Sequence, residues 1–187
     1  PRQWRCCLLL TRADCRADWA GTLRGALAGG VDAVQVREKR GEDRDRLDHI
    51  RRVVEIARPE GAAVVVNDRI DLALAADADG VHLGRGDLPI ERARAIAGEE
   101  LLIGGSSHDV AEANAAIAAG ADLIGIGCMF ASSTKPDLDL AGPETLAAVL
   151  AAIPGVRHLA IGGIGPENVA ALVAAGARGV AVGRAVC

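Results

Sequence analysis

Three polar side chains stand at alternating positions early in the chain, at the end of a short apolar run. They are Gln35, Arg37 and Lys39. Because successive residues of an extended strand point to opposite faces, these three side chains share one side. An amide and two cations on one side suit a polar, polyanionic ligand. The alternative interpretation is a solvated run of charges in which Glu38 is the internal partner of the cations.

Two carboxylates follow the next two apolar runs. Asp68 comes after Asn67 at the end of one run, and Asp87 follows the other. Mg²⁺ in proteins is usually held by one or two carboxylates together with substrate phosphates. The pair therefore predicts a Mg²⁺ site formed by Asp68 and Asp87. The alternative is that each aspartate caps the helix that follows it, since Asp is a strong N-cap residue.

Hydroxyl groups and a cation follow two later apolar runs. Ser106 comes after two glycines, and the loop at 130–136 contains Ser132, Thr134 and Lys135. Hydroxyl groups beside a cation suit phosphate oxygens, which accept hydrogen bonds from both. The alternative for the loop is an ordinary polar turn of the same composition.

Glycines end the last two apolar runs. Gly163 follows one run, and Gly183 with Arg184 follows the other. Glycine lets backbone N–H groups approach a phosphate closely, and barrels frequently bind phosphate after their seventh and eighth strands. These positions predict phosphate binding without naming a reaction.

A scaffold must bring all of these strand ends together, and the chain supplies eight short apolar runs. Most contain Val or Ile, as expected for parallel strands that are buried on both faces. Helical patterns alternate with the runs. The predicted strands cover 6–11, 31–37, 62–67, 79–84, 101–106, 121–127, 157–162 and 179–183, and the predicted helices include 43–57, 88–97, 110–119, 143–153 and 166–175.

This alternation without a linker predicts an α/β fold, a single TIM (β/α)₈ barrel domain spanning 1–187. The alternative, an open doubly wound sheet, requires a switch point and usually fewer strands. The sequence stops a few residues after the last run, so the eighth helix is expected to be missing or truncated. A second copy of the chain, in a homo-oligomer, or residues absent from this sequence would then cover the exposed flank.

Composition narrows the function classes. The net charge is −4 without a basic stripe, and the chain has one Phe, two Trp and no Tyr, which argues against nucleic-acid binding. No apolar run approaches the roughly 18 residues that a membrane span needs. The five cysteines show no C-x-x-C spacing, which predicts reduced thiols in a cytoplasmic protein. Small phosphorylated molecules are the expected partners.

Five segments together resemble the thiamine-phosphate synthase family and its sister group, the thiazole tautomerases. They read VQVREK at 34–39, VNDRIDLALAADADGVHLGRGD at 66–87, IGGSSH at 103–108, SSTKP at 132–136 and AIGGI at 160–164. The resemblance implies a transferase of thiamine biosynthesis that joins a hydroxymethylpyrimidine pyrophosphate to a thiazole phosphate and releases pyrophosphate. It also implies that the first substrate ionises before the new bond forms.

By position, the resemblance assigns a role to each candidate. Gln35 would contact the pyrimidine, and Arg37, Lys39, Asn67, Ser106 and Lys135 would hold the pyrophosphate. Asp68 and Asp87 would bind Mg²⁺, while Ser132, Thr134 and Gly163 would contact the thiazole phosphate side. Arg37, Lys39, Ser106 and Lys135 are the catalytic candidates, and Gly183 and Arg184 complete the substrate-binding set.

Three departures from the family pattern affect the wall of the pyrimidine pocket and the thiazole phosphate contacts more than the pyrophosphate site. They are Leu8 at a position that is often aromatic, Ala131-Ser132 in place of Pro-Thr, and Gly183-Arg184 in place of a hydrophobic residue and Ser.

Two other functions compete with the synthase. A thiazole tautomerase would use His108 as its acid–base group, although Gln35 and Asp87 favour the synthase. A non-catalytic barrel that binds phosphorylated ligands is the third hypothesis. The charged strand ends argue against it, because unused buried charges are costly.

Overall fold

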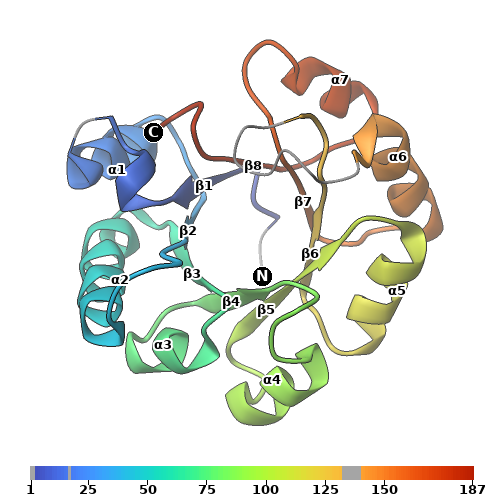
Figure 1. Ribbon diagram of the computed structural model, residues 1–187. Helices are drawn as coiled ribbons and strands as arrows, with labels where there is room; N and C mark the ends of the chain where they lie inside the picture. The colour runs from blue at the N-terminus through green and yellow to red at the C-terminus, as the bar shows by residue number, and fades with distance from the viewer. Residues whose placement is uncertain (1–2, 17, 132–139) are drawn as a thin grey trace.

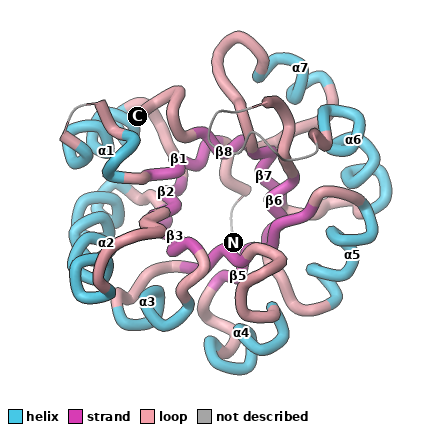
Figure 2. The backbone as a smooth tube through the Cα atoms, viewed as in Figure 1, coloured by secondary structure: helices cyan, strands magenta, loops and turns pink. Residues whose placement is uncertain are grey.

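Eight parallel strands close into a barrel in the computed structural model, which describes residues 3–16, 18–131 and 140–187 (Figures 1 and 2). The strands follow chain order, and β8 pairs back onto β1 with Cys6 opposite Val180. This closure excludes the open sheet. The strands are β1 (Cys6–Leu10), β2 (Ala33–Val36), β3 (Ala63–Asn67), β4 (Gly80–Leu83), β5 (Leu102–Ser107), β6 (Leu123–Ile126), β7 (His158–Ile161) and β8 (Val180–Val182).

The helices of the described residues form a ring outside the barrel (Figure 1). They are α1 (Trp19–Ala28), α2 (Asp43–Ala57), α3 (Ile70–Ala75), α4 (Ile90–Ala97), α5 (Val110–Ala118), α6 (Gly142–Ala152) and α7 (Val169–Ala174), with short 3₁₀ turns η1 (Arg12–Asp14) and η2 (Arg58–Glu60). After β8 the described chain makes a turn rather than a helix. Within the described residues, none of the helices is long and apolar enough to cross a bilayer.

Alternation along the strands sorts the core into an inner and an outer layer. The inner layer fills the amino-terminal end of the barrel and comprises Trp4, Cys7, Ala33, Val65, Leu123, Leu159 and Ala181. The outer layer lies between the strands and the helices, where Val64, Val66 and Val81 meet the apolar faces of their neighbouring helices. Because one end of the barrel is filled with apolar side chains, polar side chains are left to the carboxyl ends of the strands.

Local hydrogen bonds set the helix boundaries. Asp109 accepts a hydrogen bond from the Glu112 N–H at 2.7 Å and so begins α5, the helix predicted at 110–119. The helix predicted at 166–175 begins later, at Val169. Asn168 accepts from the Gly165 N–H at 3.0 Å and donates to the Gly163 carbonyl at 2.8 Å, which keeps 165–168 in a turn.

Candidate active site at the carboxyl ends of the strands

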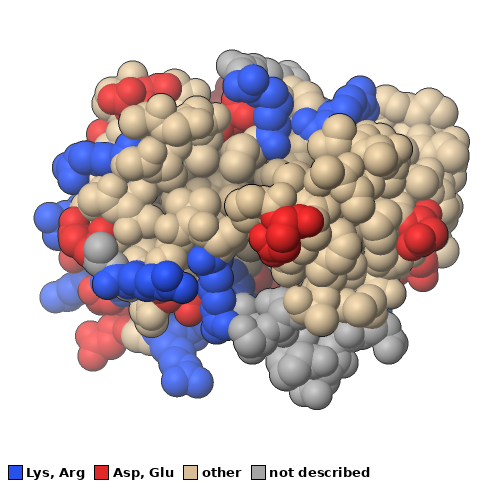
Figure 3. Space-filling view, turned by 90° about the horizontal axis from the view of Figure 1, so that it is seen from above, with Lys and Arg blue, Asp and Glu red and all other residues tan. Residues whose placement is uncertain are grey.

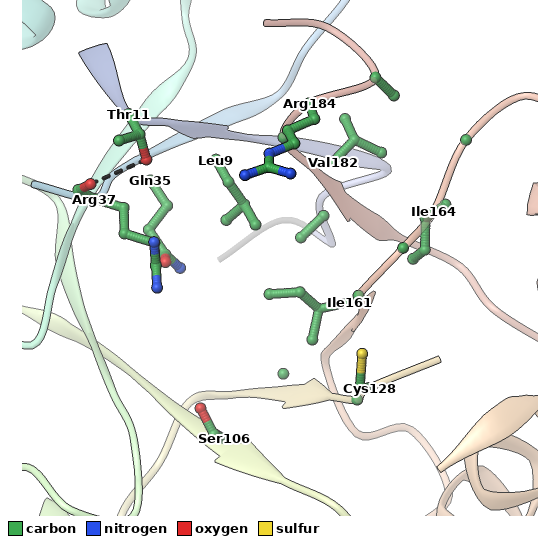
Figure 4. Close-up of a pocket in the computed structure, with 18 of the residues that line it drawn as sticks. Leu9, Thr11, Gln35, Arg37, Ser106, Cys128, Ile161, Ile164, Val182 and Arg184 are labelled. Carbon is green, nitrogen blue, oxygen red and sulfur yellow. Dashed lines mark hydrogen bonds between the residues drawn. The ribbon is translucent and has the colours of Figure 1, made fainter. Parts of the chain in front are cut away.

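A cavity of about 540 Å³ opens at the carboxyl ends of the strands (Figure 4). Seven of the residues predicted to bind substrate line it: Gln35, Arg37, Asn67, Ser106, Gly163, Gly183 and Arg184. The structure thus brings together candidates that are up to 149 positions apart in the sequence. Ser132, Thr134 and Lys135 lie outside the described residues.

The end of β2 carries the amide and the first cation. Gln35 is 5% exposed, and Figure 4 shows it beside Arg37 on one side of the cavity. The Arg37 backbone is held on β1, because its N–H donates to the Leu10 carbonyl at 2.8 Å and its carbonyl accepts from Thr11 Oγ1 at 3.1 Å. The predicted alternation therefore places Gln35 and Arg37 together at the cavity.

Glu38 points away from the cavity, which corrects the alternative that it is the internal partner of its neighbouring cations. Its Oε1 accepts a hydrogen bond from the Arg12 N–H at 2.7 Å and lies 3.6 Å from His49 Nε2 on α2. Glu38 therefore fastens the end of β2 to η1, while Arg37 on the opposite face remains available to a ligand.

Lys39, Asp68 and Asp87 form a small charged cluster beyond the ends of β2, β3 and β4. They are not among the residues that line the cavity, although Asn67, which precedes Asp68, is. Lys39 Nζ is 3.3 Å from Asp68 Oδ2, and Asp87 Oδ2 accepts a hydrogen bond from the Gly84 N–H at 2.7 Å. Burial raises the pKa of Asp87, and the neighbouring Asp68 carboxylate adds to that rise against the opposing effects of Gly84 and Lys39. Two carboxylates in one place repel each other, and a bound cation relieves the repulsion.

The helix-capping alternative does not describe either aspartate. The residue that precedes α3 in the N-cap position is Arg69, and the corresponding residue of α4 is Pro89. Asp68 has φ of 65°, an unusual conformation for a residue other than glycine, and its N–H donates to the His82 carbonyl at 2.9 Å. Neither aspartate therefore occupies the N-cap position of the helix that follows it.

The donor set of this cluster suits a hard divalent ion. Carboxylate oxygens are the ligands that Mg²⁺ prefers, and Mg²⁺ usually keeps waters and substrate phosphates as further ligands. Among the described residues, no group of three or more His, Cys, Asp or Glu side chains could hold a metal by itself. Asp68 and Asp87 thus fit an ion that shares its coordination with a phosphorylated ligand.

The end of β5 joins Ser106 to a histidine that sequence reasoning did not single out. His82 on β4 lines the cavity, and its Nε2 lies 3.0 Å from Ser106 Oγ. The alternation that places Gln35 inward also places His82 inward, so the pattern contained this signal. His108 lines the cavity too, and its Nδ1 lies 3.0 Å from Glu112 Oε2 at the start of α5.

Glycine backbone together with mainly apolar side chains forms the opposite wall. Gly163 has φ of 62°, and a Cβ atom there would lie 2.6 Å from the Phe130 and Ala131 carbonyl oxygens. Only glycine fits this position without a shift of the backbone. Asn168 holds the segment by its two hydrogen bonds to Gly163 and Gly165.

The end of β8 adds a second cation. Figure 4 shows the Arg184 guanidinium over the cavity. Its Nη2 is 3.9 Å from Asp14 Oδ1 on η1, and the Arg184 side chain is half-exposed. Asp14 also lines the cavity, and sequence reasoning missed it although η1 directly follows the carboxyl end of β1.

Charge is distributed unevenly over the outside as well. Figure 3 shows charged side chains crowded on the side of α1 and α2, whereas the side of α6 and α7 is largely uncharged. The two helix sequences explain this, because α2 reads DRDRLDHIRRVVEIA and α6 reads GPETLAAVLAA.

The closed barrel, with a polar cavity at the carboxyl ends of its strands, has the architecture of an α/β-barrel enzyme, because such enzymes place their active sites there. The family model described as "Thiamine monophosphate synthase" matches residues 6–186. The chain therefore belongs to the thiamine monophosphate synthase family. This membership confirms the thiamine-phosphate synthase and transferase class predicted from the sequence.

Individual relatives agree. The chain is 45% identical to the thiamine-phosphate synthase of Moorella thermoacetica over 165 residues, which are 88% of this chain and 78% of that protein. It is 48% identical to the thiamine-phosphate synthase of Gloeobacter violaceus over 163 residues, which are 86% of this chain and 47% of that longer protein. A solved thiamine phosphate pyrophosphorylase from Pyrococcus furiosus superimposes with a TM-score of 0.88 at 34% identity, covering 96% of this chain and 85% of the other.

Proposed function

We propose that this protein joins a hydroxymethylpyrimidine pyrophosphate to a thiazole phosphate and releases pyrophosphate. The observation that carries the proposal is the set of polar side chains on one cavity. Gln35, Arg37, Asn67 and Ser106 line it, and Asp68, which follows Asn67 in the chain, is paired with Lys39. An amide, two cations and a carboxylate pair suit an aminopyrimidine joined to a polyanion.

The proposed reaction requires stabilisation of the negative charge on the departing pyrophosphate rather than removal of a proton. The bond between the pyrimidine methylene carbon and the pyrophosphate oxygen breaks, and the departing pyrophosphate keeps the electron pair. The pyrimidine-stabilised carbocation is then captured by the thiazole nitrogen. Arg37 and Lys39, with Asn67, Ser106 and Lys135, would hold the leaving group where negative charge accumulates. Gln35 would orient the pyrimidine ring.

Asp68 and Asp87 would hold Mg²⁺, which would neutralise charge on the pyrophosphate when bound. The support for this assignment is the adjacent carboxylate pair and the raised pKa of Asp87. Lys39 Nζ, 3.3 Å from Asp68 Oδ2, would hold that carboxylate in position beside the ion.

The thiazole phosphate would bind on the glycine-rich side. Gly163 and Gly183 expose backbone at the ends of β7 and β8, and Arg184 adds a guanidinium that can pair with a phosphate through two hydrogen bonds. Ser132 and Thr134 would complete this site. Arg184 would then replace the contact that most family members make with other residues at this position.

His108 keeps the thiazole tautomerase as a second candidate. It lines the cavity, and its Glu112 partner could orient the ring for acid–base work. The same contacts are also those of a histidine that is tied to the start of α5. The two functions differ in which residue the reaction needs, since isomerisation requires proton transfer and the synthase reaction requires stabilisation of pyrophosphate.

Product analysis separates the candidates. The purified protein is incubated with both synthase substrates and Mg²⁺, and separately with the unisomerised thiazole. We expect thiamine phosphate, with His108→Ala retaining most of the activity and Lys135→Ala losing about 10²–10³-fold in kcat. Isomerised thiazole without thiamine phosphate, together with an inactive His108→Ala variant, would refute the synthase proposal.

We propose further that a second copy of the chain covers the flank beside β8. Val180 on the outer face of β8 is only partly buried, whereas Val64 and Val66 on the outer face of β3 are 0% and 2% exposed. Val186 beyond the strand is exposed. Light scattering at several concentrations tests this, and a monomer at all of them would contradict it.

The five free cysteines support a reducing compartment such as the cytoplasm.

A further inference from the structure

His82 is a buried imidazole in the wall of the cavity that has no role in the proposed reaction as described so far. It is 8% exposed, belongs to β4 and faces the inside of the barrel. Its Nε2 lies 3.0 Å from Ser106 Oγ on the neighbouring strand β5. A polar ring in this position costs desolvation unless its nitrogens form hydrogen bonds, and Ser106 supplies one partner.

Two glycines make the space that the ring occupies. A Cβ atom at Gly104 would lie 2.5 Å from His82 Nδ1, and one at Gly125 would lie 2.9 Å from His82 Cε1. Any larger residue at either position would displace the imidazole from Ser106. The ring therefore occupies space that is free because Gly104 on β5 and Gly125 on β6 have no side chains. Close packing against these two glycines fixes the orientation of the ring toward the Ser106 hydroxyl.

The hydroxyl of Ser106 has one proton, and the chemistry of a phosphate determines where that proton must point. A fully ionised phosphate oxygen accepts hydrogen bonds and donates none, so Ser106 can bind it only as a donor. The Ser106 oxygen must then accept from its other neighbour. His82 meets that need when Nε2 carries a proton.

We propose that His82 is a positioning residue that donates its Nε2–H to Ser106 Oγ and thereby directs the Ser106 proton toward the departing pyrophosphate. The inference rests on the proposed function, because it takes pyrophosphate as the group that Ser106 meets. A donor that is already oriented costs no reorganisation when charge develops, so the effect should be larger on kcat than on KM.

The backbone of His82 has a separate task, which makes the side chain testable alone. Its carbonyl accepts the Asp68 N–H at 2.9 Å and so holds the turn after β3. A substitution at position 82 leaves this carbonyl in place. A loss caused by the side chain can therefore be separated from a loss of the Asp68 conformation.

The test is a double-mutant cycle on thiamine phosphate formation. His82→Leu removes the donor at similar volume, His82→Gln keeps an N–H group at the same reach, and Ser106→Ala removes the hydroxyl. We expect His82→Leu to lower kcat about tenfold with little change in the pyrimidine pyrophosphate KM, the scale of one lost hydrogen bond. His82→Gln should recover most of that loss, and His82→Leu should have no further effect in the Ser106→Ala background.

Two outcomes overturn the proposal: equal losses in the Leu and Gln variants, or full additivity of His82→Leu with Ser106→Ala. Calorimetric titration with inorganic pyrophosphate and Mg²⁺ provides a readout that needs no turnover. It should show weaker binding in His82→Leu, restored binding in His82→Gln, and no added loss in the double variant. Thermal unfolding of each variant identifies any that fail to fold. If the wild type forms no thiamine phosphate, the proposed function fails, and the pyrophosphate titrations still decide whether His82 acts through Ser106.

Discussion

The two halves of the cavity offer a ligand different chemistry. Strands β1 to β5 present side chains, with Gln35, Arg37, Asn67 and Ser106 at the cavity. Strands β6 to β8 present mainly glycine backbone and apolar groups, and Gly163 typifies them. Negative charge that develops during a reaction is best stabilised by strong hydrogen-bond donors that are already fixed in place. A phosphate that does not react can be bound by backbone N–H groups alone. Under the proposed function, the side-chain half would meet the departing pyrophosphate and the glycine-rich half would hold the thiazole phosphate.

Removing the cation of the side-chain half should have the largest effect. Arg37→Ala should lower kcat for thiamine phosphate formation by about 10²–10³-fold, because one preorganised electrostatic donor to the leaving group is lost. Steady-state kinetics with both substrates measures this. Arg40→Ala, an exposed arginine on the same loop, is the matched control and should change kcat little. A loss below about threefold in Arg37→Ala would remove the distinction between the halves.

The carboxylates of the same half should matter only when pyrophosphate is present. Asp87→Asn should raise the Mg²⁺ concentration for half-saturation about tenfold or more, since it removes one charged ligand of the ion. Calorimetric titration of Mg²⁺ with and without pyrophosphate measures this. Asp48→Asn, an exposed position on α2, controls for the change in charge. Tight Mg²⁺ binding to the free wild type, or a wild-type response in Asp87→Asn, would contradict the assignment.

The buried His49, which lies behind the side-chain half of the cavity, should make the stability of the fold sensitive to acid. Burial lowers the pKa of His49, beside Glu38, to about 4. Between pH 6.5 and 4 the unfolded chain takes up a proton that the folded chain refuses, so the free energy of unfolding should fall by about 2–3 kcal/mol as the pH drops. Urea unfolding at pH 7 and pH 4.5 measures this. The fall should shrink in His49→Gln, and an unchanged pH dependence would show that His49 is not its source.

His158, on the glycine-rich side, adds a smaller share of the same sign. Its pKa is also lowered by burial, and its Nε2 accepts the Arg178 N–H at 3.1 Å. The pH dependence of His49→Gln should therefore be reduced rather than abolished.

The cation on the glycine-rich half should have the smallest effect. Arg184→Ala should weaken thiazole phosphate binding by about 1 kcal/mol, since the half-exposed guanidinium is screened by solvent. Asp14→Asn, which removes the nearby negative charge, should not weaken it. Fluorescence or calorimetric titration with thiazole phosphate decides the point. A change below about 0.5 kcal/mol in Arg184→Ala is that of an ordinary surface substitution and would assign the phosphate to the backbone alone.

Periodicity made the scaffold predictable. The helix expected at 43–57 occurs with those bounds, because its buried residues recur at helical spacing. The eight strands occur where apolar runs predict them, and the family prediction is confirmed. Alternation also located Gln35 and Arg37 correctly at the cavity, since a strand offers only two directions.

Contacts between distant segments were not predictable in the same way. The partner of Glu38 is Arg12 on another element, and neither residue carries a pattern that names the other. His82 was overlooked because its importance depends on missing side chains at Gly104 and Gly125. Helix α7 begins at Val169 because the Asn168 side chain accepts a hydrogen bond from the Gly165 N–H and holds the preceding residues in a turn. Helix propensity alone does not predict this boundary.

The division of the cavity is tested most directly by measuring two affinities in two variants. Pyrophosphate, with Mg²⁺, and thiazole phosphate are titrated separately into the wild type, Arg37→Ala and Gly163→Ala, with thermal unfolding as the check on folding. The account predicts a crossed pattern. Arg37→Ala should lose affinity for pyrophosphate alone, and Gly163→Ala, whose added Cβ would press on the Phe130 and Ala131 carbonyl oxygens, should lose affinity for thiazole phosphate alone. Equal losses of the same ligand in both folded variants would contradict it.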